Sequence, residues 1–188
     1  MKPSRPELIL LAEQFEALRL LWRYAPVRAQ AMTLEALSVT LENAFDEADV
    51  EVRLMPIDQL DSETEDAPLD DEESPLVLLR FDAPLPLQCS DERLPSLLTC
   101  LDLVNEAIPF GSICLHAQNR IAFHYTYAAR ITVFDTSLVL HLLRSLEYYL
   151  AMAAQPLKRA VRSELTPDQI RAEIVAFLEQ LQHAATER

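Results

Sequence analysis

A single glycine, Gly111, occurs among the 188 residues of the chain, and this scarcity limits the folds and functions open to it. Phosphate-binding loops of the dinucleotide and P-loop types need several glycines at fixed spacing, because the backbone must turn tightly and approach the phosphates. Neither pattern can be written in this sequence. Gly111 follows the segment IPF where the chain must reverse after a predicted helix, and a residue without a β-carbon makes that turn at little steric cost.

The charge of the chain makes nucleic acids and anionic membrane surfaces poor partners. The sequence holds 30 acidic and 16 basic residues, a formal net charge of -14, which repels phosphate groups at long range. Nine of the acids fall in residues 58–73, where no base occurs. Such a run predicts a solvated loop. We therefore expect a partner that is a protein, and neither nucleic acid nor membrane.

The cysteines and the N-terminus indicate a cytoplasmic protein. Cys89, Cys100 and Cys114 are an odd number, and their spacing matches no zinc or redox motif, so we expect reduced thiols and no metal or other cofactor. Charged residues between 7 and 19 interrupt any hydrophobic region of a signal peptide. No uninterrupted apolar stretch is long enough to span a membrane.

Apolar residues at three- and four-residue spacing predict five helices, at 5–23, 33–46, 91–107, 136–154 and from 166 onward. Several have a residue that is typical of an N-cap: Ser4 with Glu7, Ser90, Asp135, and Thr166 with Gln169. Pro156 is expected to end the fourth helix.

A two-residue alternation predicts strands from Val50 to about residue 58, at 75–82 and at 84–89, and a hairpin in the segment GSICLHAQNRIAFHYTYAARI. Strands joined by short turns favour antiparallel pairing, with the helices on one face. We therefore predict an α+β protein with an antiparallel sheet of about five strands. The domain prediction is a single domain, with a helical extension at 1–29, a core at 30–162 and a last helix at 163–188.

The search for catalytic chemistry yields one candidate site. His116 and His124 lie on opposite arms of the predicted hairpin, and Asp102, Glu106 and Asp135 are the carboxylates that could complete a site with them. Histidines on a mixed hairpin face are usually surface or hydrogen-bonded residues, and no metal-binding or nucleophile motif accompanies them. An enzyme with a site around His116, His124 and Asp135 remains the alternative hypothesis.

The order of elements and the segment LVNEAIPFGSICLHAQNRIAFHYTYAARI, with the long helix that follows, resemble the YbjN-like proteins, also called bacterial sensory transduction regulators. The matching features are Asn105 near the end of the middle helix, Gly111, an aromatic second hairpin strand and a basic segment after the long helix. The resemblance covers about residues 33–162. The turn HAQNR, the acidic loop and the terminal helices depart from the pattern of that family.

This resemblance implies a fold similar to that of the type III secretion chaperones, which are small, acidic and commonly dimeric proteins that hold segments of client proteins. It implies a non-enzymatic, homodimeric adaptor, chaperone-like or regulatory, with no catalytic residue to carry over. Amphipathic helices and strands leave apolar surface for a partner, and strand pairing could supply backbone hydrogen bonds. The candidate partner-binding residues are apolar and lie on two predicted strands: Val52, Leu54, Leu76 and Leu78.

Overall fold

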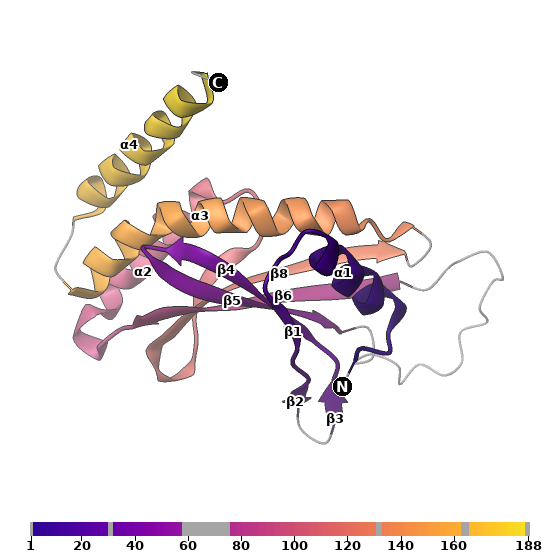
Figure 1. Ribbon diagram of the computed structural model, residues 1–188. Coiled ribbons are helices and arrows are strands. Elements are labelled where there is room, and N and C mark those ends of the chain that lie inside the picture. The colour runs from indigo at the N-terminus through magenta and orange to yellow at the C-terminus, as the bar shows by residue number, and fades with distance from the viewer. Residues whose placement is uncertain (1, 30–31, 58–75, 131–132, 163–165, 187–188) are drawn as a thin grey trace. The chain divides into compact units, whose positions relative to one another are not determined.

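The computed structural model of the protein describes residues 2–29, 32–57, 76–130, 133–162 and 166–186 (Figure 1). Its helices are α1 (Pro6–Ala17), α2 (Leu94–Ala107), α3 (Thr136–Arg162) and α4 (Pro167–Thr186). Its strands are β1 (Trp22–Tyr24), β2 (Val27–Ala29), β3 (Met32–Leu34), β4 (Leu37–Phe45), β5 (Ala48–Pro56), β6 (Leu76–Gln88), β7 (Ser112–Leu115) and β8 (Arg120–Arg130). The acidic segment predicted at 58–73 lies outside the described residues.

Six strands form one antiparallel sheet in the order β1-β4-β5-β6-β8-β7, and β2 pairs with β3 in a separate hairpin. Arg23 of β1 lies opposite Ser38 of β4, and Arg53 of β5 lies opposite Asp82 of β6. The predicted α+β class and antiparallel sheet are confirmed. The main sheet has six strands where about five were expected.

Contacts between residues divide the chain into two compact units. The first unit comprises residues 1–41, 51–83 and 124–142, and the second comprises residues 42–50, 84–123 and 143–188. In the first unit, Phe15 of α1, Leu54 of β5 and Phe81 of β6 have no exposed surface. The alternate strand residues, such as Arg53 and Asp82, are partly exposed, so one face of the strands forms the core and the other is polar.

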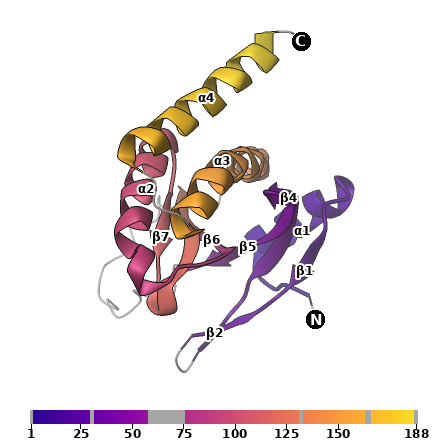
Figure 2. The same ribbon diagram turned by 90° about the vertical axis from the view of Figure 1, so that its left-hand side faces the viewer.

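In the second unit, α2 packs against α4 and β7 (Figure 2). Its fully buried side chains come from strands and helices alike and include Phe45, Leu97, Phe123, Leu146 and Leu157. Phe110 makes edge contacts with Phe123 of β8 and with Tyr149 of α3, at ring-centroid distances of 6.0 and 5.9 Å. These aromatic contacts join α3 to the hairpin strand on which the sequence showed its aromatic side chains.

The helix predicted at 33–46 is wrong, because these residues form β3 and β4. Leu37, Leu41 and Phe45 are spaced by four, and that spacing satisfies both a helical face and a two-residue alternation. Val39, which is fully buried, fits only the alternation. The β-branched side chains at positions 39 and 40 also favour a strand.

Two further boundaries differ from the prediction. The helix expected at 5–23 ends at Ala17, Arg19 takes a left-handed conformation (φ 58°), and Trp22 begins β1. The strands expected at 75–82 and 84–89 are one strand, β6. Pro84 and Pro86 have no backbone N–H to donate. Because they are two residues apart, both missing donors would face the same neighbouring strand, so β6 can still pair along its other edge.

Helix α3 continues through Pro156, although the proline was expected to end it. A proline inside a helix removes one backbone hydrogen bond and crowds the preceding turn. Residues on both sides of it are fully buried, among them Ala153, Leu157 and Ala160. Tertiary packing therefore stabilises the helix across the proline, as it does for most helices in proteins.

The predicted helix caps have mixed outcomes. Asp135 caps α3, since its Oδ1 accepts from the backbone N–H groups of Ser137 and Leu138 at 2.8 and 3.2 Å. Thr166 and Gln169 form the predicted reciprocal pair, with bonds of 2.9 and 3.3 Å. The caps predicted at Ser4 and Ser90 are wrong, because neither side chain bonds to the start of a helix.

Left-handed turns are made mostly by residues other than glycine. Gly111 has a φ of 66°, which confirms its predicted role in the reversal after α2. Asp46 and Glu47 (φ 49° and 66°) form the tight turn between β4 and β5, and Gln118 and Asn119 (φ 63° and 55°) lie in the turn between β7 and β8. Residues with polar side chains thus occupy turn positions that glycine often holds.

The turn between β4 and β5 is attached to α3 by Lys158, which forms an ion pair with Asp46 and lies 5.8 Å from the ring centre of Phe45. The hydrogen bond from Lys158 lowers the pKa of Asp46. Because the folded pKa lies below the unfolded one, the ionised pair contributes stability above about pH 4 and loses it as the pH falls further. We expect Lys158→Met to lower the urea midpoint at pH 7 and to matter less at pH 2. An equal loss at both values would contradict this.

Candidate functional site

The four predicted partner-binding residues are not equally accessible. Val52 and Leu54 have no exposed surface and belong to the core of the first unit. Leu76 is 53 % exposed, and Leu78 is partly exposed on the same side of β6. Only Leu76 and Leu78 can therefore meet a partner without unfolding of the strands.

The three residues of the enzymatic hypothesis have separate surroundings. Asp135 caps α3, and the exposed His116 follows β7, where its backbone N–H donates to the carbonyl of Arg120 at 2.7 Å. His124 contacts Asp82 and Arg80 across β6. These contacts join none of the three residues to another. Asp102 and Glu106 are exposed on α2.

His124 belongs to a charged face on the strands of the first unit. Its Nδ1 lies 3.0 Å from Asp82 Oδ1 and 3.3 Å from Arg80 Nη2. One ring nitrogen either donates to the carboxylate or accepts from the guanidinium, so its tautomer selects the partner. Arg53 lies 4.0 Å from Asp82, at a register position opposite it.

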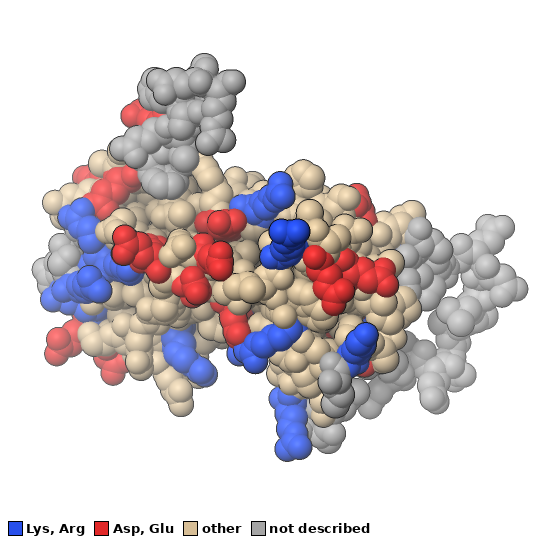
Figure 3. Space-filling view, in the orientation of Figure 1, with Lys and Arg blue, Asp and Glu red and all other residues tan. Residues whose placement is uncertain are grey.

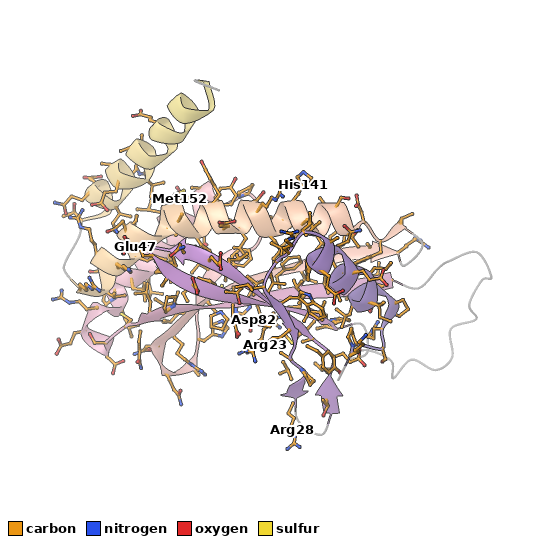
Figure 4. All side chains as sticks on the ribbon, viewed as in Figure 1. Arg23, Arg28, Glu47, Asp82, His141 and Met152 are labelled. Atoms are coloured by element: carbon orange, nitrogen blue, oxygen red, sulfur yellow. The ribbon has the colours of Figure 1, made fainter. Side chains whose placement is uncertain are left out.

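Arg23 and Glu51 extend this charged face with an ion pair of 2.5 Å, and Figure 4 labels Arg23 and Asp82. On the surface visible in Figure 3, basic and acidic side chains are interspersed. Within the described ranges, no three His, Cys, Asp or Glu side chains gather in a way that could hold a metal ion. The charged face is thus a set of mutually paired ions, typical of a solvated sheet surface.

The three thiols differ in their surroundings. Burial raises the pKa of Cys100 to about 12 and also raises the pKa of Cys89, whereas Cys114 is partly exposed on β7. This pKa lies far above pH 8, so the Cys100 thiol stays protonated there, and the thiolate is the reactive form. We expect iodoacetamide to label Cys114 first, and Cys100 only in urea, as read by peptide mass spectrometry. Fast labelling of Cys100 in the folded protein would contradict the buried placement.

At one edge of the main sheet, β7, a side chain occupies the outward backbone groups of one residue. Asn105 of α2 accepts from the backbone N–H of Ile113 at 2.8 Å and donates to the carbonyl of the same residue at 3.0 Å. The side-chain amide thus satisfies the outward backbone groups of Ile113, which a further strand would use, while those of Leu115 point the same way by the alternation of the pairing. This arrangement gives a physical role to the asparagine on which part of the family resemblance rests.

At the other edge, β1, backbone groups point away from the sheet. The carbonyl of Leu21 accepts from Thr40, and the N–H of Ala25 donates to Ala36, both at 2.9 Å. Antiparallel pairing alternates, so the backbone groups of the intervening Trp22 and Tyr24 point away from β4. Among the described residues, none accepts from or donates to these outward groups by a backbone hydrogen bond. The edge at β1 can therefore accept another strand.

A groove of about 300 Å³ adjoins β1, and we call it the edge groove. Pro3, Ile9, Ala12 and Trp22 supply its apolar surface, and Lys2, Glu13 and Glu16 supply its charged groups. Trp22 lies opposite Val39, which is fully buried, so its ring is on the same side of the sheet as the core and α1. Ile9 is 39 % exposed and Leu21, next to Trp22, is 57 % exposed.

The N-terminal segment that lines the edge groove is fixed by Glu35. Its carboxylate accepts from the backbone N–H and the hydroxyl of Ser4, at 2.8 and 2.5 Å, and from the N–H of Arg5 at 3.2 Å. Partial burial acts to raise the pKa of Glu35, but these hydrogen bonds outweigh it and hold the pKa below its ordinary value. The groove wall at Lys2 and Pro3 is therefore attached to the loop before β4.

Sequence reasoning missed this site because it assigned Trp22 to a helix. Leu18 and Trp22 are four residues apart, so Trp22 continues the helical spacing, and the apolar pattern gave no signal that the helix ends at Ala17. Compared with protein-family models and with curated proteins, the sequence shows no match to either. No helix in the described part of the chain has the length and apolar character needed to cross a bilayer.

Proposed function

We propose that the protein is a non-enzymatic adaptor, chaperone-like or regulatory, that binds an extended segment of another protein along β1. The observation that carries this proposal is the open edge at Trp22 and Tyr24 beside the edge groove. A strand added to a sheet edge gains backbone hydrogen bonds, and pockets for its alternate side chains supply selectivity. At β7, Asn105 already occupies the outward groups of Ile113, and this favours β1 for this kind of binding.

The geometry of the edge supports binding through strand addition. Side chains of an added strand would alternate between the two faces of the sheet, so every second one would meet Trp22 and the groove surface of α1. Ile9 would contact the apolar side chains of the segment. The groove is smaller than most drug-sized ligand sites, which suits one or two side chains.

The proposal includes the finer features implied by the resemblance to YbjN-like proteins: a fold like that of the type III secretion chaperones, a homodimer and a cytoplasmic location. A six-stranded antiparallel sheet with helices supports such a fold. A homodimer is compatible with binding at β1 as long as the two copies associate elsewhere. If they pair through β1 itself, the edge is not available to a partner.

The test uses two substitutions on neighbouring residues of α1. Ile9 and Leu10 are 39 % and 46 % exposed, but only Ile9 lines the edge groove. The experiment captures binding proteins from a lysate of the natural source with three tagged forms of the protein: wild type, Ile9→Asn and Leu10→Asn. We expect wild type and Leu10→Asn to retain a partner in fixed ratio. Ile9→Asn is expected to bind it about tenfold more weakly, a loss of about 1.4 kcal/mol in binding free energy.

Thermal unfolding of both variants checks that each is folded, and light scattering gives the size of the free protein. Equal retention by Ile9→Asn and Leu10→Asn would contradict a role for the edge groove. A dimer that dissociates in Ile9→Asn alone would show that β1 pairs with a second copy, and it would replace the adaptor hypothesis with a purely structural one.

A further inference from the structure

We propose that the segment bound at β1 is basic as well as apolar. It is an extended stretch in which apolar residues and Lys or Arg residues take turns along one face of the strand, two residues apart in sequence. This inference rests on the proposed function and specifies the chemistry of its partner. It follows from the charges of the edge groove, the spacing of its walls and the charge of the whole chain.

The edge groove has two carboxylates among its charged groups. Glu13 and Glu16 line it, both are exposed, and neither is ion-paired with a described residue. They are three residues apart on α1, so their side chains lie on one face of the helix. Most of the charges on the strand face of the first unit are paired, as in Arg23–Glu51, whereas these two carboxylates are available to a cation.

A strand added at β1 would present its side chains to the edge groove at a fixed spacing. Side chains on one face of a strand repeat every two residues, about 6.6 Å apart. If one apolar side chain contacts Trp22 and Ile9, the next side chain on that face lies further along α1. A Lys or Arg there can cover apolar surface with its methylene groups and place its charge at Glu13 or Glu16. A Glu in the same place would meet two like charges.

Lys2 opposes the binding of a basic segment, and a second copy of the chain would compete with it. Lys2 is the basic group of the edge groove, and its ammonium reduces the attraction for a cation. The net charge of the chain, -14, still favours approach of a basic segment. A second copy fits less well, because its own β1 would present Trp22 and Tyr24 to the groove and no basic side chain between them on that face.

The experiment uses the natural fluorescence of Trp22, which is the only tryptophan of the chain and lies in the edge groove. Three acetylated and amidated nonapeptides are compared: TVTKTVTKT, TVTETVTET and TVTQTVTQT. Each places Val and the variable residue on one face of an extended strand. We expect the Lys peptide to shift the emission saturably and to bind at least about tenfold more tightly than the Glu peptide in low salt.

Three variants of the protein separate the contributions. The double variant with Glu13→Gln and Glu16→Gln is expected to lose both the preference for the Lys peptide and the salt dependence of that binding. Lys2→Ala is expected to bind the Lys peptide more tightly. Ile9→Asn is expected to weaken all binding, while Leu10→Asn leaves it unchanged. A Lys peptide with proline in place of its central threonine, which lacks that backbone donor, tests strand pairing and is expected to bind more weakly.

The outcomes distinguish this inference from the proposed function. Equal binding of the Lys, Glu and Gln peptides would overturn the basic preference and leave strand binding at β1 in place. If none of the peptides shifts the Trp22 emission at concentrations up to about 1 mM, the inference is overturned. The retention experiment with Ile9→Asn then decides the proposed function independently. A preference for the Lys peptide that persists in the Glu13→Gln and Glu16→Gln variant would also overturn it.

Discussion

Replacing Arg5 by alanine is expected to lower the free energy of unfolding by about 3 kcal/mol, because the substitution leaves a charge buried without its partner. Arg5 Nε lies 2.5 Å from Glu7 Oε1, and the Glu7 side chain has no exposed surface. The Arg5 side chain is 21 % exposed, so its guanidinium is partly hydrated in the folded protein while the carboxylate is not. Removing the guanidinium therefore penalises the folded state through Glu7.

The matched variant is Glu7→Leu in the Arg5→Ala background. A leucine in place of the buried carboxylate removes the uncompensated charge, and we expect it to recover most of the lost stability. The backbone N–H of Arg5 still donates to Glu35 in both variants, so this contact cancels in the comparison. Urea unfolding followed by circular dichroism gives the values. A loss below 1 kcal/mol for Arg5→Ala, or no recovery with Glu7→Leu, would refute the buried-charge explanation.

Asn105→Ala is expected to lower the free energy of unfolding by about 2 kcal/mol and to make the protein associate as its concentration rises. Asn105 satisfies both the N–H and the carbonyl of Ile113, a residue that is 1 % exposed. Leaving two such groups without partners costs more than the two hydrogen bonds contribute when formed. The same two groups then offer an edge for pairing between molecules.

Glu106→Ala is the control for Asn105→Ala, since Glu106 is its exposed neighbour on α2, and we expect a change within about 0.5 kcal/mol. Unfolding measures the first effect, and light scattering over a concentration series measures the second. If Asn105→Ala is destabilised but remains the same size at all concentrations, the asparagine holds β7 in place without protecting its edge. If neither property changes, the role assigned to Asn105 is wrong.

The candidate site could be predicted only in part from the sequence. The hypothesis of strand pairing with a protein partner arose from amphipathic strands, but the residues chosen for it, Val52 and Leu54, alternate toward the core. Alternation shows that a strand has two faces and does not show which strand lies at an edge. Trp22 and Tyr24 became edge residues through pairing of β1 with a strand that begins thirteen residues after Tyr24.

The sequence by itself determined the elements whose structure depends on near neighbours. The hairpin of β7 and β8, helix α2, and the caps at Asp135 and Thr166 all form through contacts within a few residues, so local patterns predicted them.

Only the tertiary structure decided the remaining features, because each depends on surfaces that distant residues supply. Packing around α3 overcame the local preference of Pro156 to end the helix. Pairing partners made residues 37–45 a strand although their spacing by four also suits a helix. The same long-range pairing left the outward groups of Trp22 and Tyr24 without a backbone partner among the described residues, while Asn105 occupied those of Ile113 in β7, and this difference favours β1 as the proposed binding site.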